Sequence, residues 1–185
     1  MPVLLDMAIS LDGMVSRADG GVDDGLHDWY FDPTPVSKPV VEELVETSGS
    51  QVLGRNAFGS GGDSGGWDET PYAVPHFVVS HRPLPPAPPG RTVEFIGVTG
   101  GIEETIARAT DAAGTRYATL GGGADVARQC LAAGLVDEVQ LHVVPIVFGR
   151  GLRLFDDSTG GWGLRPTRVV DAPNVTHLRY TVERS

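Results

Sequence analysis

The sequence is short of cysteine and of long hydrophobic runs, and each shortage excludes a class of protein. Cys130 is the only cysteine, so an intramolecular disulfide framework is excluded and a reducing compartment is favoured. The longest apolar run, VVPIVF at 143–148, is far shorter than the roughly 20 residues that span a bilayer. The N-terminus has no basic segment and carries Asp6 within its apolar stretch, unlike a signal peptide. We therefore expect a cytoplasmic protein that does not bind membranes.

Positive charge is also scarce. Lysine and arginine together number 14 against 24 aspartates and glutamates, which gives a formal net charge of −10. Such a surface repels the phosphates of nucleic acids and anionic lipids, so we expect neither as a partner. An anionic small molecule would need a few local arginines and helix N-termini. The five histidines show no metal-ligand spacing, and we expect no metal site.

What is present is the pattern of one α/β domain over residues 1–185. A chain of 185 residues with 41% hydrophobic content is long enough to bury a sizeable core. Apolar residues alternate in some segments and recur with helical spacing in others, whereas 17–36 has little periodicity and is expected to be a loop. Strands that alternate with helices imply a partly parallel sheet with helices on its faces. Strands are predicted at 3–10, 51–54, 76–80, 92–97, 116–120, 138–144, 152–155 and 175–183, and helices at 38–49, 101–114 and 123–134.

One stretch resembles a nucleophile motif. GGDSGGW (61–67) matches the serine context of chymotrypsin-like proteases and also the G-x-S-x-G elbow of serine hydrolases. A catalytic serine needs a base, an orienting acid and an oxyanion hole, and the elbow needs a strand before it and a helix after it. The glycine-rich surroundings of Ser64 favour neither element. We interpret 59–66 as a mobile, non-catalytic loop and keep a serine hydrolase using Ser64 as a remote alternative.

Three clusters suited to phosphate follow predicted strands. Gly121–Gly123 join a strand directly to a helix, so backbone N–H groups and the helix N-terminus can meet an anion. Arg55 follows Gly54 at a second strand end, where a guanidinium can bind phosphate oxygens. Ser80 and Arg82 follow a third strand. Each cluster alone also fits an ordinary connection, but together they suit an extended nucleotide along one edge of a sheet.

The motifs and their order are similar to those of a known family. AISLDG (8–13), GRNAF (54–58), VVSHR (78–82) and the long run 121–155 resemble the dihydrofolate reductase-like superfamily, in the branch that shares the C-terminal reductase domain of bacterial riboflavin biosynthesis proteins. The resemblance covers nearly the whole chain. It implies a dihydrofolate reductase-like three-layer α/β fold, with a mixed, mostly parallel sheet of eight or nine strands flanked by helices. It also implies NADPH as the hydride donor and a homodimer.

The resemblance also implies roles for particular residues. The backbone of Ala8 would contact the nicotinamide amide, and Trp29 would lie beside cofactor and substrate. Asp12 matches the acid of the SLDG motif and is a candidate catalytic and substrate-binding residue, with turn stabilisation as the alternative role. The implied cofactor-binding residues are Ala8, Trp29, Gly54, Arg55, Ser80, Arg82, Gly122, Gly123, Ala124, Asp125 and Val126.

Three departures from the family pattern bear on the substrate. Ala57 replaces the threonine of the family's GRxT motif, and Gly121 stands where reductases of the riboflavin precursor carry an acid. Asp28 and Asp32 lie in the region of the first-helix carboxylate of dihydrofolate reductases, but they read as solvated loop acids. The expected function is NADPH-dependent hydride transfer to a C=N or C=O of a small heterocyclic or sugar-linked substrate, similar to a pterin or a riboflavin precursor. The alternative is a non-catalytic nucleotide- or flavin-binding module on the same fold.

Overall fold

The computed structural model describes residues 2–18, 25–59, 70–157 and 159–183. Within these residues, eight strands form one sheet in the order β5-β4-β3-β6-β1-β7-β10-β9, and β2 and β8 form a small second sheet. The strands are β1 (Val3–Ser10), β2 (Met14–Arg17), β3 (Ser48–Gly54), β4 (His76–Val79), β5 (Phe95–Val98), β6 (Tyr117–Gly122), β7 (Glu138–Val144), β8 (Gly151–Arg153), β9 (Gly163–Ala172) and β10 (Val175–Glu183).

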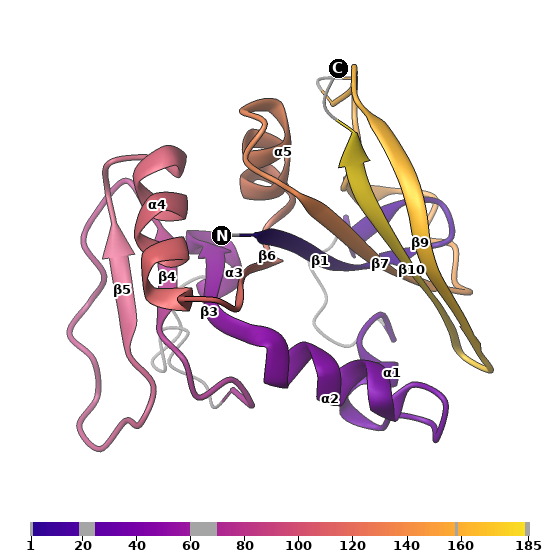
Figure 1. Cartoon of the computed structure of the whole chain (residues 1–185), viewed down its shortest axis with the longest axis horizontal. Helices are drawn as coiled ribbons and strands as arrows, with labels where there is room; N and C mark the ends of the chain where they lie inside the picture. The colour runs from indigo at the N-terminus through magenta and orange to yellow at the C-terminus, as the bar shows by residue number, and fades with distance from the viewer. Residues whose placement is uncertain (1, 19–24, 60–69, 158, 184–185) are drawn as a thin grey trace.

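The main sheet is parallel from β5 to β7 and antiparallel at β10 and β9. Helices α4 and α5 cover one face, while α1 and α2 lie on the other (Figure 1). The helices are α1 (Asp28–Phe31), α2 (Lys38–Thr47), α3 (Arg55–Phe58), α4 (Ile102–Ala113) and α5 (Ala124–Ala132). The expected α/β fold, a mixed and mostly parallel sheet flanked by helices, is therefore confirmed.

The side chains of the central strand β1 alternate between the two faces of the sheet. Its odd-numbered side chains, such as Leu5 and Met7, join the main hydrophobic core, which includes residues of α4 and α5. Ala8 belongs instead to a smaller cluster with Trp29 of α1. Because side chains alternate along a strand, Asp6 shares the face of Ala8. The single charge in this apolar strand thus lies on the side covered by α1 and α2.

The boundary between α2 and β3 differs from the prediction. The helix was expected to end at Gly49 and the strand to begin at residue 51, yet β3 begins at Ser48, directly after α2. A Cβ atom at Gly49 would overlap the backbone of Ala113 at the end of α4. Gly49 therefore permits close approach of a strand and a helix, which sequence alone does not distinguish from a helix stop.

Four elements were not predicted from the sequence, and one of them is the one-turn helix α3 that follows β3. The segment expected to be a loop contains α1, and β2 follows the turn at residues 11–13. The fourth is β9, whose exposed residues and Pro166 hide the strand pattern. The strand lies at the sheet edge, and its register with β10 shifts at Arg179/Tyr180, where Pro166 is the partner of Tyr180. An edge strand tolerates a proline because one side of its backbone needs no partner.

None of the described helices is long and apolar enough to cross a membrane.

Candidate functional site

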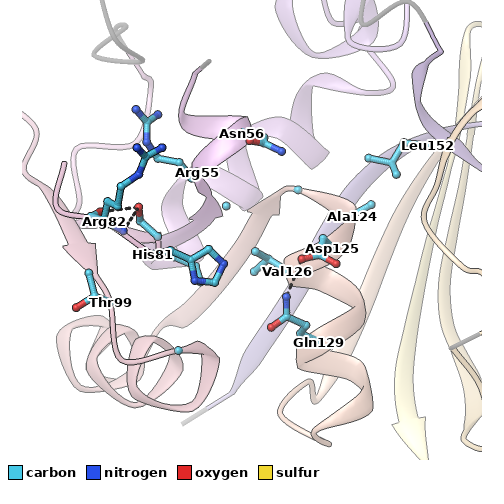
Figure 2. A pocket seen from close by; sticks show the side chains of 15 residues that line it. Arg55, Asn56, His81, Arg82, Thr99, Ala124, Asp125, Val126, Gln129 and Leu152 are labelled. Atoms are coloured by element: carbon cyan, nitrogen blue, oxygen red, sulfur yellow. Dashed lines mark hydrogen bonds between the residues drawn. The ribbon is translucent and has the colours of Figure 1, made fainter. Parts of the chain in front are cut away.

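A cleft of about 410 Å³ lies at the carboxyl edge of the parallel strands, which is where ligands bind in open α/β sheets. We call it the Arg55 cleft. It is bordered by the residues that follow β3, β4 and β5 and by the start of α5 (Figure 2). Its lining residues are Gly54, Arg55, Asn56, Val79, Ser80, His81, Arg82, Thr99, Gly101, Gly123, Ala124, Asp125, Val126, Gln129 and Leu152.

The structure brings most of the residues implied by the family resemblance into this cleft. Gly122 lines neither the cleft nor the second pocket described below, and Ala8 and Trp29 line that second pocket. The three strand-end clusters therefore meet, as an extended nucleotide would require. The implied residues that line the Arg55 cleft are Gly54, Arg55, Ser80, Arg82, Gly123, Ala124, Asp125 and Val126.

Two helix N-termini reach the cleft. Helix α5 begins after Gly123 and α4 begins after Gly101, and both glycines have a positive φ, +89° and +92°. A Cβ atom at Gly123 would lie 3.5 Å from the backbone nitrogen of Gly54, so the two glycine turns approach each other closely. Backbone N–H groups at helix N-termini favour anions. This part of the cleft is therefore suited to a pyrophosphate.

Arg55 and Arg82 supply the positive charge of the cleft, and Figure 2 shows both on the side opposite α5. The guanidinium of Arg55 donates a hydrogen bond to the carbonyl of Gly59 and lies 5.3 Å from the ring centroid of Phe58. These contacts limit its conformational freedom. Arg82 is exposed. A constrained and an exposed guanidinium at one end of the cleft suit a second phosphate group.

Ser80 has a local structural contact. Its buried hydroxyl donates to the carbonyl of Arg82 over 2.6 Å and accepts from the backbone N–H of Arg82 over 3.3 Å. These two bonds close the turn that carries Arg82. In this geometry, Ser80 stabilises the turn that carries Arg82.

A second pocket of about 250 Å³ lies between α1 and the sheet, and we call it the Asp6 pocket. Its floor comes from neighbouring strands, since Asp6 is paired in register with Gln140, and Ala8 with His142. The ring of Trp29 stacks on His142, with 4.0 Å between centroids. The lining residues are Asp6, Ala8, His27, Trp29, Tyr30, Phe31, Gln51, Thr70, Pro71, Tyr72, Gly121 and His142.

A chain of hydrogen bonds leads from Asp6 into the protein. Oδ1 of Asp6 lies 2.9 Å from Nε2 of His142, and Nδ1 of His142 lies 2.6 Å from Nδ1 of His177. Nε2 of His177 lies 3.0 Å from the hydroxyl of Ser37. Burial, together with the neighbouring His142, lowers the pKa of His177 to about 4, so His177 is neutral at physiological pH. Gln140 donates a further bond to Oδ1 of Asp6.

Two tyrosines complete the wall of this pocket. Burial raises the pKa of Tyr30, and burial together with the nearby charge of Asp6 raises the pKa of Tyr72. Both hydroxyls therefore stay neutral at physiological pH. Nε1 of Trp29 and Nε2 of Gln51 are buried and find no hydrogen-bond partner among the described residues.

Sequence reasoning did not assign Asp6, Gln51 or His142 to a site. The sequence offered one signal, the single charge of Asp6 inside an apolar strand. The contact between Asp6 and His142 joins strands 136 residues apart in sequence, and that pairing follows only from the order and register of the sheet.

Asp12, the candidate catalytic acid, lines neither pocket. It accepts hydrogen bonds from the hydroxyl of Ser10 and from the backbone N–H groups of Phe148 and Gly149. The bonds from Ser10 and Phe148 are the main causes that lower the pKa of Asp12 to about 2. These contacts tie the turn after β1 to the loop before β8. They are the contacts of a turn-stabilising acid, the alternative role that the sequence offered.

We expect Asp12→Asn to lower the free energy of unfolding at neutral pH. Because the folded-state pKa is depressed, the stabilisation is present above the unfolded value of about 4 and is lost as pH falls toward the folded value. The difference between wild type and variant should therefore shrink below about pH 4. Urea unfolding across this range checks it, with the exposed Asp111→Asn as control. A pH-independent difference would contradict the ionic role.

The other predicted positions are not brought together. Ser64 and most of the 59–66 loop lie outside the described residues. Asp28 and Asp32 are exposed and line neither pocket. Ala57 packs against Gly122, where a Cβ atom would lie 2.8 Å from that of Ala57.

The sheet order, the helices on both faces and the cleft at the carboxyl edge define a dihydrofolate reductase-like α/β protein. The chain belongs to the RibD C-terminal domain family, whose pattern matches residues 2–177. It is 24% identical to the uncharacterized protein YwjB of Bacillus subtilis over 183 residues, 96% of this chain and 95% of that protein. A putative riboflavin biosynthesis protein from Shewanella sp. PV-4 is 26% identical, with both chains covered completely and a TM-score of 0.75.

Two more distant structures share the fold. One is the Thermotoga maritima diaminohydroxyphosphoribosylaminopyrimidine deaminase/5-amino-6-(5-phosphoribosylamino)uracil reductase, 16% identical over 97% of this chain and 56% of that chain, with a TM-score of 0.66. The other is Enterococcus faecalis dihydrofolate reductase complexed with NADP(H), 20% identical over 100% of this chain and 96% of that chain, with a TM-score of 0.63. Family membership and these neighbours support an oxidoreductase of the riboflavin-pathway reductase type.

Proposed function

We propose that the protein is an NADPH-dependent reductase that transfers hydride to a C=N or C=O of a small heterocyclic or sugar-linked molecule. The observation that carries the proposal is that two pockets of different chemistry share strands of one sheet. β3 contributes Gly54 to the Arg55 cleft and Gln51 to the Asp6 pocket. β6 ends between them, with Gly121 lining the Asp6 pocket and Gly123 lining the cleft. A dinucleotide in the cleft would thus reach the second pocket with its nicotinamide end.

The residues present fit this cofactor. The close approach of Gly123 and Gly54 leaves backbone at the start of α5 for a pyrophosphate. Arg55 and Arg82 would bind the 2′-phosphate, and the backbone of Ala8 would meet the nicotinamide amide. When bound, NADPH supplies the hydride.

The chain's own residues would bind and orient the substrate. Trp29 is held by its stacking on His142 and forms a flat wall of the Asp6 pocket. Asp6 accepts N–H groups, and the neutral hydroxyls of Tyr30 and Tyr72 stabilise charge that develops on a substrate oxygen or nitrogen. In this proposal Asp12 acts on the fold and does not touch the reacting atoms.

Titration calorimetry with NADPH and NADH tests cofactor binding, and loss of NADPH absorbance with a panel of pterins, flavin precursors and quinones tests turnover. We expect tight NADPH binding and turnover with one of these substrates. Absence of NADPH binding would overturn the proposal. Binding without turnover across the panel would instead assign a non-catalytic nucleotide- or flavin-binding module. The expected homodimer stays a prediction, which sedimentation equilibrium can check.

Ser64→Ala should leave reductase activity within a few-fold of wild type, because the proposed chemistry uses no serine nucleophile. A fluorophosphonate probe should leave Ser64 unlabelled. Labelling of Ser64, or a loss of activity of about a hundredfold or more, would restore the serine hydrolase alternative.

A further inference from the structure

The two pockets have opposite charge. Arg55 and Arg82 line the cleft, whereas no lysine or arginine is among the described residues that line the Asp6 pocket. Asp6 is the one acidic residue of that lining, and His27 and His142 are its only residues that protonation could make cationic. The segments 19–24 and 60–69, outside the described residues, also contain no lysine or arginine in sequence. Among the described residues that line it, the Asp6 pocket therefore offers an anion no permanent cation.

Asp6 is held by two side chains of β7, Gln140 and His142. Gln140 donates to Oδ1 over 3.0 Å, and Nε2 of His142 lies 2.9 Å from the same oxygen. Within the described part of the chain, the hydrogen bonds of Asp6 all go to Oδ1, and Oδ2 is not among the buried atoms that lack a partner. Oδ2 is thus accessible, and it remains to accept a hydrogen bond from a ligand.

Two arginines beside Gln140 are paired with glutamates. Arg168 donates to the amide oxygen of Gln140, and its other nitrogen pairs with the carboxylate of Glu43. Arg179 pairs with Glu43 and with Glu138. Neither arginine lines the pocket. Both arginines are therefore paired with glutamates and lie outside the pocket lining.

Two buried nitrogen donors lack partners in the same pocket, as does the hydroxyl of Tyr30. Nε1 of Trp29 and Nε2 of Gln51 have no hydrogen-bond partner among the described residues, and the side chains are 3% and 5% exposed. A buried donor that stays unpaired is unfavourable, so a ligand that supplies an acceptor is favoured. The pocket thus presents two nitrogen donors, the hydroxyl of Tyr30 and one anionic acceptor beside a flat aromatic wall.

We propose that the Asp6 pocket takes an uncharged, planar nitrogen heterocycle without a phosphate group, whose ring N–H faces Asp6 and whose carbonyl oxygens face Trp29 and Gln51. The inference deepens the proposed function, on which it rests, by naming the substrate class. A substrate without phosphate would distinguish this chain from the Thermotoga maritima protein, which is named as a 5-amino-6-(5-phosphoribosylamino)uracil reductase. A phosphate brought beside Asp6 would meet like charge in a partly buried site.

Uridine and uridine 5′-monophosphate form a matched pair of probes. Both carry a ring N–H between two carbonyl groups, and they differ in the phosphate. The protein is first saturated with NADP⁺ so that the phosphate cannot occupy the Arg55 cleft. The measurement follows the indole N–H resonance of Trp29 by nuclear magnetic resonance, assigned with Trp29→Phe. Conditions of about pH 8 keep histidines neutral, and about 10 mM salt limits screening.

We expect uridine to shift the Trp29 resonance and to bind about fivefold or more tighter than its monophosphate. Asp6→Asn removes the charge at constant size and should bring the two affinities within about twofold. Asp28→Asn makes the same charge change on exposed Asp28 of α1, outside the pocket lining, and should keep the wild-type ratio.

Equal or tighter binding of the monophosphate would overturn the proposal, as would the absence of a Trp29 shift with either probe or an equal effect of Asp28→Asn. If Asp6→Asn does not fold, the wild-type affinity ratio and its decline with added salt decide the question. Failure of the proposed function is separate, because it appears as absence of NADP⁺ binding in the same samples. In that case, the uridine titration at Trp29 is repeated without the dinucleotide, so that the pocket is still tested.

Discussion

Arg55→Ala is expected to weaken NADPH binding by roughly ten- to a hundredfold and to leave NADH binding nearly unchanged. The 2′-phosphate, which NADH lacks, is close to a dianion at neutral pH. A protein with a net charge of −10 repels it unless cations are placed locally. One charge-assisted hydrogen bond contributes about 1.5–3 kcal/mol, which corresponds to this range of affinity.

Arg55 should bind a phosphate more tightly than an ordinary surface arginine. Its contacts with the carbonyl of Gly59 and the ring of Phe58 hold the side chain, so less conformational entropy is lost when phosphate binds. The preference for NADPH should be smaller than in relatives with the family's threonine, because Ala57 lacks its hydroxyl. Arg82, exposed on the neighbouring loop, should contribute less than Arg55.

Calorimetric titration of both dinucleotides measures this preference. Arg108→Ala is a matched control, since Arg108 also lies over an aromatic ring, that of Phe77, but does not line the Arg55 cleft. Added salt should reduce the wild-type preference for NADPH by screening. Equal affinities for NADPH and NADH in the wild type would refute the assignment of Arg55.

Gly123→Val should lower NADPH affinity by at least tenfold, about 1.4 kcal/mol, in a protein that still folds. A branched side chain would stand where the backbone at the start of α5 meets the pyrophosphate. The nearest atoms to an added Cβ belong to Gly54, at 3.5 and 3.6 Å, so the first carbon fits without overlap. The positive φ of +89° adds conformational strain of about 1–2 kcal/mol.

Gly134→Val separates strain from cofactor binding. Gly134 has a φ of +66° with no atom within 4 Å of an added Cβ, and it follows α5 at the end remote from the cleft. Both variants should lose thermal stability to a similar extent, but only Gly123→Val should lose NADPH affinity. Unchanged NADPH titration in folded Gly123→Val would remove this site.

Local patterns predicted much of the fold. The alternation in β1, β7 and β10 and the apolar stripes of α4 and α5 match their structural elements closely, because burial on one face imposes a period on the sequence. The elements that were missed are exposed or short, so burial imposes little period on them: the edge strand β9, the short β2 and the one-turn helices α1 and α3. Gly49 was misread because a helix stop and a close packing contact both select glycine.

For the candidate site, the sequence by itself determined the strand-end clusters around Arg55, Ser80 and Gly123, since glycine and arginine chemistry at a turn is local. It also determined the overall scarcity of positive charge, and the described lining of the Asp6 pocket contains no lysine or arginine. Only the tertiary structure decided that those clusters line one cleft, and that Asp6, Gln51 and His142 meet beside Trp29. Their contacts depend on the order and register of strands far apart in the chain, and no local pattern encodes which strand will lie beside which.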